Sequence, residues 1–213
     1  MYSINQTEKI KGSGKRFQSA MDFDVPIRAS DHFICVPSLG SIRPGWVLIT
    51  PRRRVLNMAQ LNANERVDLQ EFFQSIWNDV GNSYGEVCAF EHGAQQVGSA
   101  TGCGVDQAHL HVVPISAEAI KLATSGLVDW TSHPYQLPDL DTRSREYLWL
   151  TDSTHSYVAH PFVPVSQFFR RAVADVSGMS DRWDYRIHPF HEHIAETRRV
   201  LSGARAPQQT RAA

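Results

Sequence analysis

The sequence has few cysteines, no long apolar run and almost no net charge. Its cysteines are three, Cys35, Cys88 and Cys103, and no Cys-x-x-Cys pair occurs, so neither a disulfide framework nor a zinc ribbon is indicated. No apolar run approaches the ~20 residues that span a bilayer, and the polar N-terminus lacks the apolar stretch of a signal peptide. A formal net charge of −1 provides no global field for a nucleic-acid polymer or an anionic membrane. We therefore expect a cytoplasmic protein with neither of these partners.

The composition is that of an ordinary globular protein, with 42% hydrophobic and 20% charged residues among 213. This length suits one large domain with an extension. We expect a flexible arm over residues 1–20, a domain over 21–120, and a C-terminal extension over 121–213 that packs on this domain. The last ten residues, 204–213, read as a frayed tail.

Short β-branched runs predict strands over 32–37 and 46–50, joined by a turn-rich segment. Apolar residues at three- and four-residue intervals then predict one long helix from about Asn64 to Gly81. A strand over 86–90, a glycine-bearing loop over 91–106 and a strand ending at Pro114 follow. Because strands dominate and do not alternate regularly with helices, the predicted class is α+β, an antiparallel meander with a helix packed on one face.

The C-terminal part is less regular. Its apolar spacing and turn residues predict a helix over 116–128, a loop over 130–142, a hairpin from 146–150 and 155–158, and helices over 166–176 and 191–201. Ser166 is the expected N-cap of the first of the last two helices.

The segment QAHLHVVP (107–114) carries the most informative pattern. On a strand, alternate residues share a face, so Gln107, His109 and His111 lie opposite the apolar Ala108 and its alternates. This polar face is typical of a site, yet a solvated strand face with two histidines is equally compatible with the pattern. Two such histidines also suit a metal, although no third ligand lies at typical spacing.

The preceding loop, GSATGCG (98–104), favours a site. Glycines let backbone N–H groups converge on an anion, and hydroxyl side chains add donors. The loop therefore predicts a phosphate cradle beside the histidines. Its contributing residues are Ser99, Thr101, Gly102, Cys103 and Gly104.

These motifs resemble the histidine-triad (HIT) superfamily. QAHLHVVP is similar to the signature His-φ-His-φ-His-φ-φ, with φ apolar, and RPGWVLITPRR (43–53) is similar to the family's strand after Pro-Gly-His. The resemblance covers about residues 30–116 and implies a HIT-like fold. The order of FEHG (90–93), GCGVD and AHLHVVP resembles a bacterial branch of the superfamily, and the segments SQFFRRA and WDYR are compatible with it.

The sequence departs from the family pattern at two positions. Gln107 replaces the first triad histidine, and Trp46 replaces the histidine after Pro-Gly. The resemblance implies that His109 is a nucleophile that attacks the phosphorus of a nucleotide and forms a nucleotidyl-histidine. His111 would contact a phosphate oxygen or the leaving group. Gln107 would position phosphate without acid–base work, because an amide cannot carry a proton to a leaving group.

Five further residues are candidate substrate contacts. The resemblance places Glu91 and His92 near the nucleotide or leaving group and Ser38 near the sugar, whereas a polar pair at a strand end is commonly only solvated. Arg170 and Gln167 lie on a predicted helix from which an arginine can reach phosphate. The run Arg52–Arg54 reads as structural or peripheral rather than catalytic.

The sequence thus predicts a hydrolase or nucleotidyl transferase acting on phosphorus, with a nucleotide or nucleotide-conjugate substrate, no cofactor and no metal. A homodimer is compatible with the resemblance. Two alternatives stay open at this point. One is a non-catalytic nucleotide-binding protein on the same scaffold, and the other is a metal-dependent lyase that uses the histidine pair.

Overall fold

The computed structural model describes residues 24–101, 105–138, 145–161, 163 and 165–203. The predicted arm over 1–20, the predicted tail over 204–213 and the cradle residues Gly102, Cys103 and Gly104 lie outside these ranges. None of the described helices combines the length and apolar character that a membrane crossing requires.

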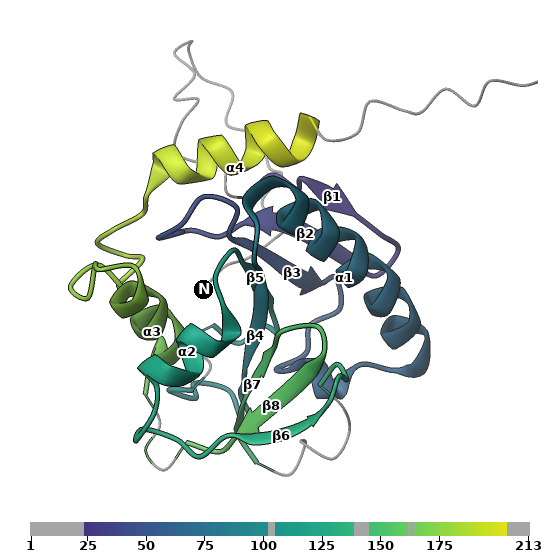
Figure 1. Cartoon of the computed structure of the whole chain (residues 1–213). Coiled ribbons are helices and arrows are strands. Elements are labelled where there is room, and N and C mark those ends of the chain that lie inside the picture. The colour runs from purple at the N-terminus through teal and green to yellow at the C-terminus, as the bar shows by residue number, and fades with distance from the viewer. Residues whose placement is uncertain (1–23, 102–104, 139–144, 162, 164, 204–213) are drawn as a thin grey trace, which may run out of the picture.

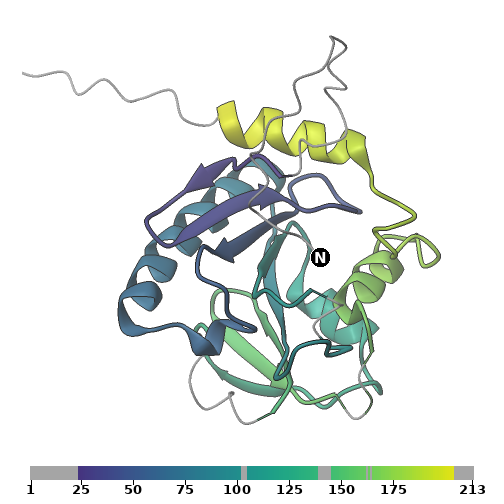
Figure 2. The same cartoon turned by 180° about the vertical axis from the view of Figure 1, so that it is seen from behind.

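Within the described residues, eight strands form one antiparallel sheet in the order β1-β2-β3-β5-β4-β7-β8-β6 (Figures 1 and 2). The strands are Arg28–Ala29 (β1), Phe33–Pro37 (β2), Val47–Pro51 (β3), Cys88–Gly93 (β4), Leu110–Val113 (β5), Thr131–Pro134 (β6), Tyr147–Thr151 (β7) and His155–Ala159 (β8). The predicted α+β class is confirmed. Strands β6 to β8 belong to the predicted C-terminal extension, and β7 pairs with β4, so this part of the chain continues the sheet.

Helices cover both faces of the sheet (Figure 1). They are Ala63–Tyr84 (α1), Ala117–Ala123 (α2), Phe168–Val176 (α3) and His191–Gly203 (α4), with a 3₁₀ turn at Met58–Gln60 (η1). One core cluster joins α1 and α4 to one face through residues such as Phe73 and Leu201. The other cluster joins α2 and α3 to the opposite face through Ile120 and Phe169.

Helix α1 begins close to the predicted start, where a capping box fixes its first turn. The Asn62 side chain accepts from the Glu65 N–H at 3.0 Å, and the Glu65 carboxylate accepts from the Asn62 N–H at 2.8 Å. The helix ends at Tyr84 and is followed by the C-cap Gly85, whose φ of 93° suits glycine. Hence the predicted helix is confirmed, with three extra residues beyond Gly81.

Several local predictions are wrong. Residues 131–134 are not loop but the edge strand β6, which pairs with β8. Ser166 is not an N-cap, because Gln167 occupies that position at φ 58° and α3 begins at Phe168. The helix expected over 116–128 is shorter, and β4 continues to Gly93 where a loop was expected from Glu91.

The alternation of side chains in β4 and β5 divides the sheet into two chemically distinct faces. Leu110 and Val112 join the cluster under α1. His111 pairs with Phe90 on the opposite face, toward α3. Because β5 begins at Leu110, Gln107 and His109 precede the strand rather than lie in it. The face predicted to be polar is therefore an aromatic face that contains histidines.

Candidate active site

His109 is held by the backbone of its own segment. Its Nδ1 atom lies 2.8 Å from the carbonyl oxygen of Gln107. A carbonyl oxygen only accepts hydrogen bonds, so Nδ1 carries the ring proton. The neutral imidazole then has its unprotonated lone pair on Nε2, the atom that is able to attack an electrophile.

His111 is buried next to His109, with ring centroids 4.8 Å apart. Its ring stacks on Phe90 at 4.6 Å. The indole Nε1 of Trp46 lies 3.0 Å from His111 Nδ1. An indole nitrogen only donates, so Nδ1 of His111 accepts and the proton of a neutral ring is on Nε2. His111 thus has the opposite tautomer to His109 and offers an N–H donor.

His92 completes a cluster of three histidines on this face. Its ring lies 6.0 Å from that of His111, and its Nε2 accepts from the Phe169 N–H at 3.2 Å, at the start of α3. Its Nδ1 is buried and makes no hydrogen bond with the described residues. The alternative of a solvated polar pair at 91 and 92 is wrong, because both side chains are buried.

Arg170 brings a positive charge to the same face from α3. Its guanidinium donates to the Ser38 hydroxyl at 2.7 Å and to the Leu39 and Gly40 carbonyls, both at 2.6 Å. It also lies 4.7 Å from the centre of the Trp46 ring. Ser38 and Arg170, 132 positions apart in the sequence, are therefore in direct contact beside the histidines.

The loop that receives Arg170 depends on Gly40. Its φ is +70°, and a Cβ there would lie 2.4 Å from the Tyr185 Cβ. Both the positive φ and the close approach require glycine. The Gly40 carbonyl can therefore point at the guanidinium.

Comparison with known proteins supports the resemblance over part of the chain. Residues 26–118 match the HIT domain family. One similar solved structure is a HIT-like protein involved in cell-cycle regulation from Bartonella henselae, with an unknown ligand. It is 17% identical to this chain, the match covers 42% of this chain and 68% of that one, and the TM-score is 0.37. No curated protein matches the chain.

The HIT domain segment contains Trp46 and the three histidines, whereas Arg170 lies beyond it. The described site is therefore assembled from the HIT segment and from α3 of the C-terminal part. Sequence reasoning noted Trp46 as a departure but missed its bond to His111. It also missed Phe169, whose N–H donates to His92 and whose ring stacks on Phe90 at 4.3 Å. The available sequence signal was the aromatic character of Trp46, Phe90 and Phe169.

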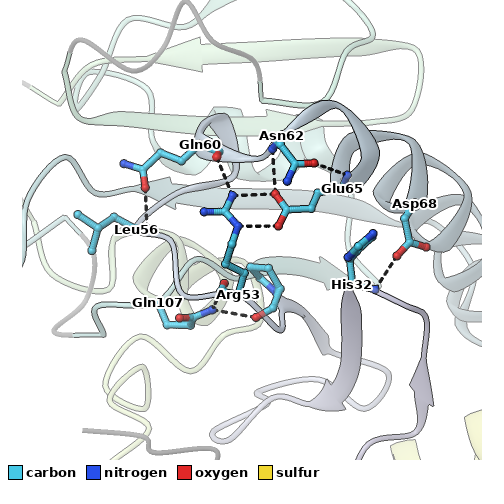
Figure 3. Close-up of polar contacts among 9 residues, drawn as sticks. His32, Arg53, Leu56, Gln60, Asn62, Glu65, Asp68 and Gln107 are labelled. Carbon is cyan, nitrogen blue, oxygen red and sulfur yellow. Dashed lines mark hydrogen bonds and ion pairs between the residues drawn. The ribbon is translucent and has the colours of Figure 1, made fainter.

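The Gln107 side chain lies with the segment after β3. Its amide nitrogen donates to the Pro51 carbonyl at 2.9 Å and to the Arg53 carbonyl at 3.2 Å (Figure 3). Arg53 in turn forms two hydrogen bonds with Glu65 at 2.6 and 2.7 Å. Gln107 therefore connects the histidine segment to the start of α1, and Arg53 is structural, as predicted.

Glu91 points to the other face of the sheet. Its carboxyl accepts from the Met58 N–H at 2.7 Å and from the Tyr147 hydroxyl at 2.6 Å. Burial raises its pKa to about 7, partly opposed by these two hydrogen bonds. The structure thus does not bring Glu91 to the histidine face, although it brings His92 there.

The hydroxyl groups of the predicted cradle contact a carboxylate. Ser99 and Thr101 both donate to Glu146, the latter at 2.6 Å. Gln167 is buried at the N-cap of α3, next to the segment that reaches His92. Phosphate binding by the loop over 98–104 therefore stays a prediction.

The electrostatics of the site favour uncharged histidines. Burial, followed by the neighbouring His109 and Arg170, lowers the pKa of His92 to about 3 and that of His111 well below 6.5. Burial and Arg170 also lower the pKa of His109, although its bond to Gln107 opposes the shift. At neutral pH, the site therefore combines three uncharged histidines with one fixed cation, Arg170.

Two further features lie apart from this chemistry. A cavity of about 330 Å³ is lined by residues such as Pro44, Met179 and His193, not by the histidines of β4 and β5. Among the described residues, no group of three or more histidine, cysteine, aspartate or glutamate side chains is arranged to hold a metal ion.

Proposed function

We propose that this protein is a hydrolase or nucleotidyl transferase that acts on phosphorus through His109. The substrate is a nucleotide phosphoanhydride or phosphoramidate, and the intermediate is a nucleotide covalently bound to His109. The observation that carries the proposal is the bond between His109 Nδ1 and the Gln107 carbonyl, because it leaves Nε2 unprotonated. The match of residues 26–118 to the HIT domain supports the same chemistry.

The reaction has two displacements. In the first, the Nε2 lone pair of His109 forms a bond to the α-phosphorus, and the bond from phosphorus to the leaving group breaks with its electron pair. In the second, water or another acceptor attacks the same phosphorus, and the N–P bond breaks. The attacking group loses its proton to solvent, and His109 regains its free Nε2. Splitting one difficult displacement into two is the advantage of a covalent route.

The surrounding groups have distinct functions in this proposal. His111 offers its Nε2–H to a non-bridging oxygen or to the leaving group, since Trp46 occupies Nδ1. Arg170 attracts the phosphate and favours the unprotonated histidines. Gln107, Ser38 and His92 act in positioning. The remaining cradle residues and Gln167 are proposed to contact the substrate.

A nucleotide-binding protein without turnover is the second candidate. The Trp46 contact with His111 favours it, because an Nδ1 atom that accepts from the indole N–H leaves His111 uncharged and unable to protonate a leaving group. A cytoplasmic location and a homodimer stay predictions under either candidate.

Steady-state turnover separates the two. Purified protein is offered a panel of nucleoside polyphosphates and nucleoside phosphoramidates, and the release of nucleoside monophosphate is followed by chromatography. Wild type and the exposed control His191→Ala are expected to turn over at equal rates, and His109→Ala to lose activity by at least ~10³-fold. Binding without release from any member of the panel supports the second candidate instead.

A further inference from the structure

Trp46 occupies the position where the family has histidine, and it contacts His111 directly. The indole is fully buried, and its Nε1 lies 3.0 Å from His111 Nδ1. The Phe90 ring centroid lies 5.8 Å from that of the indole, and the Arg170 guanidinium lies 4.7 Å from the indole centroid. Because these neighbours fix the ring, the indole N–H has a set direction toward His111.

We infer that Trp46 is a positioning residue that keeps His111 uncharged as an Nε2–H donor and so deprives the site of a general acid. A second proton on His111 would have to enter at Nδ1, where it would face the indole N–H. Two donors cannot share one hydrogen bond, so the charged form requires the loss of the Trp46 contact. The inference rests on the proposed function, in which His111 faces the reacting phosphate.

The groups around His111 reinforce this restriction. Arg170 on α3 is a fixed cation, and His109 and His92 are the nearest titratable rings. A positive charge on His111 would add to that of Arg170 in a buried site, which is unfavourable. Burial and these neighbours lower the pKa of His111, in agreement with the geometry.

No other described group supplies the missing proton. His92 accepts from Phe169 at Nε2, so it too is a neutral ring, with a pKa of about 3. The Gln107 amide has no acidic proton at neutral pH. The Glu91 carboxyl is on the opposite face of the sheet, bonded to Tyr147 and Met58.

The consequence is a restriction on the substrate. When the bond between His109 Nε2 and phosphorus forms, the leaving group departs with the electron pair of its broken bond. With no acid beside it, the leaving atom must be stable as an anion, stabilised only by the His111 N–H. Phosphate-type oxygens of an anhydride meet this condition. The amine of a phosphoramidate does not, because it needs a proton before it departs.

The test compares Trp46→Phe, which retains an apolar ring but removes the N–H, with wild type and Trp183→Phe. Trp183 stacks on Arg171 and serves as a matched control. The substrates are nucleoside 5′-phosphate esters of substituted phenols with graded leaving-group pKa, together with one phosphoramidate. For wild type and the control, kcat/KM is expected to fall by about tenfold per unit of leaving-group pKa, with little phosphoramidate turnover. Trp46→Phe is expected to show a shallower dependence.

A second readout does not depend on activity. The ¹⁵N NMR signals of His111 report which ring nitrogen carries a proton. The expected result is a protonated Nε2 and a bare Nδ1 in wild type at pH 7, and mixed or doubly protonated forms in Trp46→Phe. Trp46→His is a second variant in case the phenylalanine protein does not fold.

The outcomes are distinct. A protonated Nδ1 in wild type, or rapid phosphoramidate turnover with a shallow leaving-group dependence, overturns the inference. If no substrate turns over, the proposed function fails. In that case the restriction on the leaving group falls with it, while the NMR signals still decide whether Trp46 sets the tautomer of His111.

Discussion

The Nδ1 atom of His109 bonds to the backbone oxygen of Gln107 at 2.8 Å, not to its side chain. The orientation of the imidazole is therefore independent of which side chain occupies position 107. A substitution of the side chain at position 107 should therefore leave the orientation of His109 unchanged. The Gln107 side chain instead joins the histidine segment to the end of β3.

Replacing Gln107 tests whether its backbone carbonyl, and not its side chain, orients His109. Gln107→Ala keeps the backbone carbonyl, so the rate of attack by His109 is expected to fall by less than about tenfold. The Pro51 and Arg53 carbonyls lose a donor, which is expected to lower the free energy of unfolding by about 1 kcal/mol. Single-turnover kinetics and urea unfolding measure the two effects. Complete loss of attack with an intact fold would show that the Gln107 side chain is itself essential.

Arg170 is expected to affect both rate and pH dependence. If its charge attracts phosphate as proposed, a loss of about 1.5–3 kcal/mol, typical of a charge-assisted interaction, means that Arg170→Gln should lower kcat/KM by about 10- to 150-fold. Because His109 is active when neutral, kcat/KM of wild type should fall only at pH values below the usual histidine pKa of about 6.5. Removing the cation should move this fall to higher pH.

The neighbouring Arg171→Gln is the matched control for that prediction. Arg171 lies on the same helix but stacks on Trp183 and donates to the Ser166 carbonyl. Arg171→Gln should leave both kcat/KM and its pH profile unchanged. Equal effects of the two substitutions would contradict a specific function for Arg170.

Glu91 makes the stability of the fold depend on pH. Its pKa is about 7 in the folded protein, against the usual 4.5, so the folded state favours the protonated carboxyl. Its stabilising contribution is therefore greatest below pH 4.5 and is lost as the pH rises from about 4.5 to 7. Glu91→Gln keeps an acceptor oxygen for the Met58 N–H and places an uncharged amide group beside the Tyr147 hydroxyl, and it should flatten this part of the curve.

Urea unfolding of Glu91→Gln at a series of pH values measures this effect, with the exposed Glu86→Gln as control. At pH 8, Glu91→Gln should be at least as stable as wild type. An unchanged slope between pH 4.5 and 7 would mean that Glu91 is charged in the folded protein.

Glu65 has the opposite pH dependence. The bond to Arg53 holds its pKa at about 2, so its contribution is complete above the usual 4.5 and is lost as the pH falls from about 4.5 to 2. Glu65→Ala removes both this ion pair and half of the capping box, and should cost about 2–3 kcal/mol at pH 7. The exposed Glu71→Ala on the same helix should cost far less. Equal unfolding midpoints of the two variants would contradict this account of the start of α1.

Sequence patterns predicted the elements that local periodicity defines. Helix α1, strands β2 and β3 and the hairpin of β7 and β8 all follow from apolar spacing and turn residues. Strand β6 was missed because its sequence, Thr131–Pro134, has no apolar alternation and is defined by pairing with β8. Gln167 was missed as the N-cap because its αL conformation depends on the surroundings of α3, not on its own preference.

The contacts of the site likewise divide into those local in sequence, which were predictable, and those between distant residues, which were not. The bond between His109 and Gln107 spans two positions, so a motif could predict it. The contacts of Trp46 with His111 and of Ser38 with Arg170 span 65 and 132 positions. They arise from the register of β3 against β5 and from the packing of α3 on the sheet. The sequence identified these residues as unusual or polar, but not as partners.

Direct observation of the covalent intermediate tests the central claim. Protein is mixed with a nucleoside polyphosphate, quenched in alkali within the first turnover, and measured by intact-protein and peptide mass spectrometry. The account predicts one acid-labile nucleoside monophosphate adduct on His109 in wild type, none in His109→Ala, and an unchanged adduct in His191→Ala. Turnover without an adduct, or an adduct on another residue that persists in His109→Ala, would contradict it.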